Sequence, residues 1–147
     1  MMKLNSEGEG NVEIFQSLAL PSLALWVGLN MLLTLGLALN VTRLRFGQAA
    51  GKVEDDELDR GVRAHGNNIE YVPFALLGMG VLCLMGYPSA WMHALGGALF
   101  LARIMHAHGI QQPGPGLPKT RVLGNLVTWL VFLTLGGVLI FEFINHI

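Results

Sequence analysis

The amino-acid sequence predicts an all-α integral membrane protein, a four-helix bundle with four transmembrane helices, formed by residues 1–147 as a single domain. The chain is 52% hydrophobic and 13% charged, whereas soluble domains carry roughly 25% charged residues. Each of four apolar segments approaches the ~17–25 residues that a spanning helix requires. These segments are residues 18–42, 71–87, 89–105 and 122–141, all approximate. A soluble four-helix bundle is the weaker alternative, because stretches such as "LVTWLVFLTLGGVLIF" lack a polar stripe.

The first span is expected at about residues 18–42. The residues before it include Glu7, Glu9 and Glu13 and several glycines, and we expect them to form a loosely ordered tail. A secretory signal would have a basic leader and a small-residue cleavage site, and neither is present. The first span should therefore stay attached.

The second helix is expected at about residues 56–87, with its first third in the cytosol. It follows the acidic run "EDDELD", in which Asp55 or Asp56 can cap the helix. The other acidic side chains complement the positive end of the helix dipole. Residues 63–70 then lie at the membrane boundary.

The third and fourth spans are expected at about residues 89–108 and 120–143. The "GYPS" turn precedes the third span, and "GIQQPGPGLPK" must be irregular because prolines and glycines dominate it. It places a break after His108. Cys83 is the only cysteine, so no intrachain disulfide can form, and its position within a span indicates a small buried hydrophobe.

Basic residues predict the orientation of the chain. Of the nine Lys and Arg residues, all but Lys3 lie in or beside the two connections at residues 43–63 and 103–121. Basic loops of membrane proteins face the cytoplasm, so both termini should be non-cytoplasmic. We expect a bacterial inner membrane protein that contacts lipid and has no nucleic-acid partner.

A polar face is predicted on the second helix where it enters the membrane. At about 100° per residue, Arg63, Asn67 and Glu70 fall within about 60° of one another. A structural ion pair between Arg63 and Glu70 would explain them. Further cationic groups end or begin the other spans at the same level, which favours an anionic ligand. They are Arg43, Arg45, Arg103, His106 and Arg121.

The stretch "RAHGNNIEY" (residues 63–71), at the cytoplasmic start of the second span, resembles the MAPEG family, the membrane-associated proteins of eicosanoid and glutathione metabolism. The resemblance is to its bacterial-type members similar to microsomal glutathione transferases. It implies a homotrimer that binds glutathione, a co-substrate, between subunits. Arg63 and Asn67 would contact the polar ends of the peptide, Glu70 its ammonium group, and Tyr71 would line the pocket. His65 fills a further position of the motif.

The third span carries a second part of the family pattern in "RIMHAHGI". Arg103 and Gly109 match this pattern, whereas His106 and Ile110 replace its two tyrosines, the first of which is also a histidine in some members. The resemblance implies that Arg103 and His106 contribute to the glutathione site. The resemblance implies an arginine that stabilises the glutathione thiolate, because a thiol with a pKa near 8.5 is mostly protonated at neutral pH. Arg121 and Arg43 are the catalytic candidates. The other substrate would be a hydrophobic electrophile that enters from the bilayer.

We therefore expect a glutathione-dependent transferase or peroxidase. A non-catalytic protein of the same fold, binding glutathione or lipid in a regulatory or structural role, is the main alternative. A small transporter subunit fits less well, because the charges lie at one face and not at mid-depth. The pair His106 and His108 does not indicate a metal site, since side chains two residues apart on a helix diverge by about 160°–200°.

Overall fold

The computed structural model describes the backbone of residues 5–145 and the side chains from Ala19 onward. The described residues form four helices and no strand. The helices are α1 (Asn5–Ala49), α2 (Asp55–Leu84), α3 (Ser89–Gln111) and α4 (Lys119–Asn145). The predicted all-α class is confirmed.

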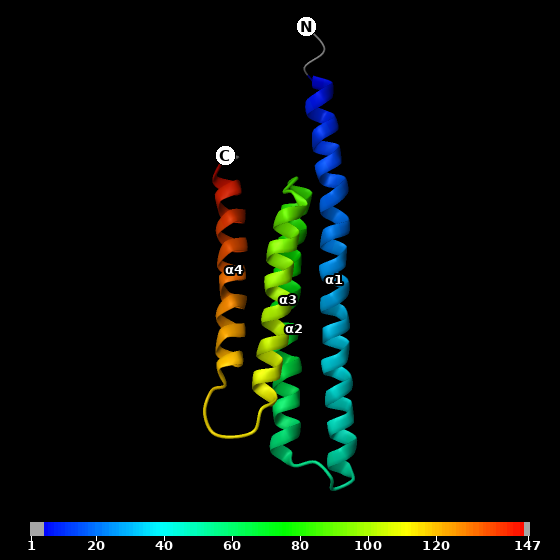
Figure 1. Cartoon of the computed structure of the whole chain (residues 1–147), viewed down its shortest axis with the longest axis vertical. Helices are drawn as coiled ribbons and strands as arrows, with labels where there is room; N and C mark the ends of the chain where they lie inside the picture. Colours follow the sequence, from blue (N-terminus) through cyan, green and yellow to red (C-terminus); the bar gives the residue numbers. More distant parts are fainter. Residues whose placement is uncertain (1–4, 146–147) are drawn as a thin grey trace.

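The four helices run roughly side by side, with α2 and α3 in the middle and α1 and α4 on opposite flanks (Figure 1). Within the described residues α1 and α4 make no contact, and α3 packs against each of the other three helices. The α1–α2 and α3–α4 connections lie at one end of the bundle, and the short α2–α3 turn lies at the other. We call the first of these the loop end.

Two helices begin differently from the prediction. The helix α1 starts at Asn5, so the loosely ordered tail expected for the first sixteen residues is wrong for residues 5–16, while residues 1–4 lie outside the described part of the chain. Extending an existing helix adds one hydrogen bond per residue without a new nucleation cost. At the start of α2 the capping position is Glu54, which makes no side-chain cap hydrogen bond, while Asp55 and Asp56 lie in the first turn. The acidic residues therefore act on the helix dipole and not as caps.

The ends of α2 and α3 also differ from the expected positions. Helix α2 ends at Leu84, because Gly86 adopts a φ of 87° that turns the chain. Helix α3 continues past the expected break after His108 and ends at Gln111. Gly109 is thus a helical residue.

Three helices in the described part are long and apolar enough to cross a membrane: residues 19–49, 55–84 and 119–145. The third expected span, α3, is not one of these three helices. Its polar residues Arg103 and His106 lower its average hydropathy, yet both are buried inside the bundle. Hydropathy averages over the whole circumference of a helix, so it counts polar groups that face the interior of the bundle as if they faced lipid.

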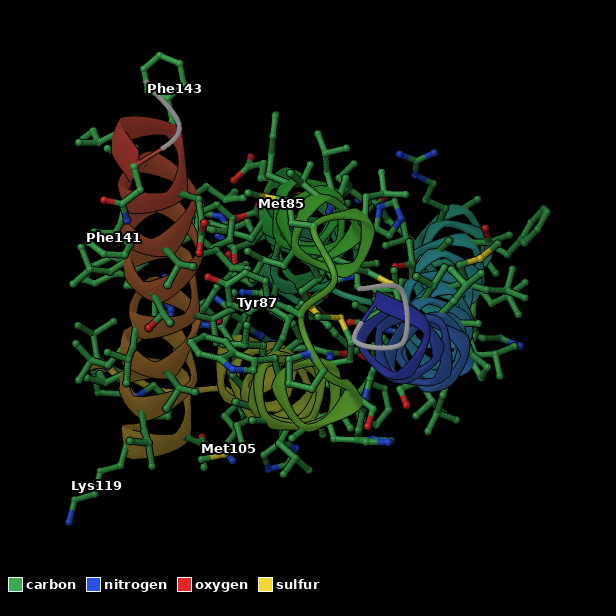
Figure 2. The ribbon with its side chains drawn as sticks, turned by 90° about the horizontal axis from the view of Figure 1, so that it is seen from above. Met85, Tyr87, Met105, Lys119, Phe141 and Phe143 are labelled. Carbon is green, nitrogen blue, oxygen red and sulfur yellow. The ribbon has the colours of Figure 1, made fainter. Side chains whose placement is uncertain are left out.

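The surface of the bundle is largely apolar. Leu84 is 83% exposed and Leu133 is 74% exposed, as expected where lipid and not water surrounds the chain. Seen from above, the sticks of α4 extend outward from the bundle, and Phe143 points away from the other helices (Figure 2). Cys83 is buried in the hydrophobic core, as predicted.

Candidate functional site

A cleft of about 670 Å³ opens between α2, α3 and α4 towards the loop end. The sequence-predicted site residues on its walls are Arg63, Asn67, Glu70, Tyr71, His106 and Arg121. Residues from three separate helices are therefore brought to one site, as the sequence pattern predicted for a common level of the membrane.

Helix α2 supplies the polar wall. Arg63, Asn67 and Glu70 recur at helical spacing, so they present their side chains to the same space. The Nη2 atom of Arg63 lies 2.8 Å from Oδ2 of Asp59, and this exposed pair is the one ion pair found among the described residues. Arg63 and Glu70 do not pair, so the structural ion pair considered as an alternative is not formed.

A close approach of α3 and α4 sets the far wall. A Cβ atom built on Gly124 would lie 2.5 Å from the carbonyl oxygen of Ala102, and one built on Gly109 would lie 2.5 Å from the backbone nitrogen of Arg121. Only glycine permits these distances. At this crossing Nδ1 of His106 lies 3.0 Å from the carbonyl oxygen of Arg121, which ties the start of α4 to α3.

Arg103 lies behind the cleft and not in it. Its side chain is fully buried, and it does not line the cleft. Its Nη2 donates to Oδ1 of Asn67 at 2.7 Å, and its Nε donates to Oδ1 of Asn68 at 3.2 Å. The guanidinium also lies over the ring of Tyr71, 5.6 Å from the ring centroid. Arg103 thus contacts two residues of the cleft wall from inside the bundle.

Two other predicted residues lie outside the cleft lining. Arg43 is exposed on α1, and its guanidinium donates to Oδ1 of Asn40 from Nη2 at 3.0 Å. His65 is half-buried on α2 and is not part of the lining. Since α1 does not touch α4, Arg43 and Arg121 lie on opposite flanks of the bundle.

The sequence analysis missed several residues of the cleft. Asn125 and Trp129 line it from α4, and their spacing from Arg121 puts all three on one face of that helix. Helical spacing was therefore a usable signal for them. The lining from α4 also includes Val122 and Leu126, which are exposed, so apart from Arg121 and Asn125 this wall is apolar and open at the side.

The charges on the lining are those of Arg63, Glu70 and Arg121. Two cations and one anion complement a ligand that carries more negative than positive groups. No group of three or more His, Cys, Asp or Glu side chains able to hold a metal ion occurs in the described part of the chain. His106 is buried and His108 is exposed, which agrees with their predicted divergence.

Comparisons with known proteins agree with the motif and the fold. The model of the MAPEG family matches residues 23–141, a range that includes every residue of the cleft. The chain is 32% identical over 112 residues to "Inner membrane protein YecN" of Escherichia coli strain K12, covering 75% of this chain and 83% of that protein. YecN of Escherichia coli O6:H1 matches to the same extent. No solved structure matches the chain.

Proposed function

Because the chain belongs to the MAPEG family, we propose that it is a glutathione-dependent transferase or peroxidase that acts on hydrophobic electrophiles. One observation carries the proposal: a single cleft combines a charged wall on α2 with an apolar, laterally open wall on α4. A reaction between a charged peptide and a lipid-soluble electrophile requires both surfaces in contact with the same space.

The charged wall suits the peptide. The planar guanidinium of Arg63 can hold a carboxylate through two parallel hydrogen bonds, and the carboxylate of Glu70 can pair with the ammonium group. Asn67 and Tyr71 supply neutral polar contacts beside them. Arg63 must leave Asp59 to do so, which costs little because both side chains are more than half exposed.

The apolar wall suits the electrophile. Val122, Leu126 and Trp129 line the cleft and are each at least 41% exposed. In a membrane these side chains border lipid, so an apolar molecule can reach the cleft without crossing water. Bound glutathione supplies the sulfur nucleophile that attacks such a molecule.

Arg121 is the group proposed to stabilise the thiolate. It lies in the first turn of α4 beside the charged wall. A guanidinium stays protonated at any physiological pH, so it favours the anion without giving up a proton. Arg43 reaches a cleft only from a neighbouring copy, because α1 and α4 of one protomer lie on opposite flanks. A ring in which each α1 meets the next protomer's cleft, as in a homotrimer, would place it there.

The location follows from the charges. The cleft and both basic connections occupy the same end of the bundle, so the positive-inside bias supports a cytoplasmic cleft with both termini on the other side. The similarity to a bacterial inner membrane protein supports a bacterial inner membrane.

Ligand-dependent melting tests the binding site. Glutathione at 100 times its dissociation constant should stabilise the protein by about 2.7 kcal/mol. Arg63→Lys keeps the charge and the pairing with Asp59 but loses the planar fork, so it should remove most of the glutathione-dependent shift and leave the ligand-free melting temperature nearly unchanged. Glu70→Gln should act likewise. Wild-type protein that shows no shift at millimolar glutathione would contradict the proposal.

A blocking substitution tests the cleft directly. A Cβ atom on Gly66, which lines the cleft, meets nothing within 4 Å. Gly66→Leu should therefore fold but fill part of the cleft and abolish glutathione-dependent conjugation of an aryl halide. Gly80→Leu is the matched control, because Gly80 lies on the same helix with equally open space around its Cβ and outside the cleft. Equal activity of the two variants would place the reaction elsewhere.

A non-catalytic binding role is the second candidate, and Ile110 favours it. This residue lines the cleft where the family pattern has a tyrosine, so the site lacks one hydroxyl donor. Glutathione-dependent stabilisation without aryl halide conjugation would select this role.

A further inference from the structure

Arg103 is a buried cation without a buried anion. It is fully buried in α3, and no carboxylate contacts it among the described residues. Its hydrogen bonds go to the side-chain oxygens of Asn67 and Asn68. A charged group in a membrane-spanning bundle is costly and is retained where it serves a site.

The arginine fixes the orientation of every amide that it contacts. A guanidinium has only donors, so Asn67 and Asn68 must both turn their oxygens towards it. The Nδ2 of Asn68 is then left to donate, and it meets Oγ1 of Thr34 at 2.9 Å. The hydroxyl of Thr34 in turn donates a hydrogen bond to the carbonyl oxygen of Asn30 at 2.8 Å. The chain of hydrogen bonds runs in one direction from α3 through α2 to α1.

The same argument leaves the Nδ2 group of Asn67 free. Its oxygen is held by Arg103, it lines the cleft, and its Nδ2 has no hydrogen-bond partner in the described part of the chain. With its oxygen held by Arg103, Asn67 has its Nδ2 free to donate to a group in the cleft. A free asparagine side chain could rotate and present either a donor or an acceptor.

We propose that Arg103 is a positioning residue, held in place by Asn68 and Thr34, which fixes the Asn67 amide so that its Nδ2 donates to an acceptor oxygen of the bound thiol peptide. Arg103 does not touch the ligand. Its cation also lies over the ring of Tyr71, which in addition meets the ring of Phe132 in a T-shaped arrangement with centroids 5.5 Å apart. Arg103 therefore contacts a second cleft residue. This inference rests on the proposed glutathione site.

The test changes Asn68, which is fully buried and outside the cleft. Asn68→Leu removes the acceptor that holds Arg103, whereas Asn68→Asp keeps an acceptor at that position. The dissociation constant for glutathione is measured by titration calorimetry, together with kcat for an aryl halide at saturating glutathione. Asn68→Leu should raise the dissociation constant about tenfold, as for a lost hydrogen bond to a charged ligand, with kcat unchanged. Asn68→Asp should stay within about twofold of wild type.

The outcomes distinguish failure of the positioning role from failure of the proposed glutathione site. A Leu variant that folds and binds like wild type, or an Asp variant as weak as the Leu variant, overturns the positioning role while the wild type still binds glutathione. If Asn68→Leu does not fold, the nearly isosteric Thr34→Val, on the α1 side of the chain of hydrogen bonds, should still weaken glutathione binding by about two- to threefold. Unchanged binding by Thr34→Val would also overturn the positioning role. Wild-type protein that binds no glutathione overturns the proposed function and this inference together.

Discussion

The substitution Gly124→Ala tests the close approach of α3 and α4 that forms the far wall of the cleft. The added Cβ atom would lie 2.5 Å from the carbonyl oxygen of Ala102 and 2.7 Å from the backbone nitrogen of His106. Ordinary contacts of this kind are about 3.5–4.0 Å. Backbone atoms cannot rotate away as a side chain does, so the two helices must separate by about 1 Å to reach that distance.

The size of the effect follows from two opposing terms. Overpacking typically costs about 1–3 kcal/mol, whereas replacing a helical glycine by alanine gains about 1 kcal/mol in helix propensity. Gly136→Ala, on the same helix, carries only the gain, because a Cβ atom there meets nothing within 4 Å. The propensity gain cancels between the two variants, so Gly124→Ala should be less stable than Gly136→Ala by about 1–3 kcal/mol.

Thermal unfolding in detergent, followed by tryptophan fluorescence, measures this difference. For a chain of this size 1 kcal/mol corresponds to about 2–4 °C, so the two melting temperatures should differ by about 2–12 °C. Separating the helices also moves His106, whose Nδ1 lies 3.0 Å from the carbonyl oxygen of Arg121. Gly124→Ala should therefore bind glutathione more weakly than Gly136→Ala.

A Gly124→Ala protein that melts at or above the Gly136→Ala protein would refute this reasoning, since it would mean that α3 and α4 do not meet backbone to backbone at this point. Weaker binding without any loss of stability would place Gly124 in direct contact with the ligand instead.

Further predictions concern orientation, assembly and the charged wall. Cysteine labels at Lys52 or Gly114, introduced with Cys83 replaced by alanine, should react only from the cytoplasmic side; labelling from outside intact cells would overturn the orientation. Mass measurement in mild detergent should give a homotrimer, and a stable monomer that binds glutathione would exclude a site between subunits. Asp59→Asn frees Arg63 from an i,i+4 pair worth about 0.2–0.5 kcal/mol, so glutathione should bind about 1.4- to 2.3-fold more tightly. Weaker binding would show that Arg63 does not meet the ligand.

The charged wall of α2 was the part of the site most open to prediction. Arg63, Asn67 and Glu70 share a face because helical periodicity is a property of a single segment, and all three line the cleft. The same periodicity also favoured Asp59 over Glu70 as the ion-pair partner of Arg63. Asp59 is one turn away at i,i+4 spacing, and Glu70 is about two turns away.

The sequence by itself determined that the protein is helical, that it belongs in a membrane, and that its basic connections share one end of the bundle, because composition, segment length and charge are properties of each stretch of chain alone. Only the tertiary structure decided which polar residues face the cleft and which support it from within. Arg63 lines the cleft and Arg103 does not, although both are arginines at similar levels of neighbouring helices. Arg103 is turned inward by Asn68, 35 residues away along the chain, and α4 reaches the site because glycines let its backbone meet that of α3. Such contacts depend on how helices pack, and packing between distant segments leaves no periodic signal in either segment.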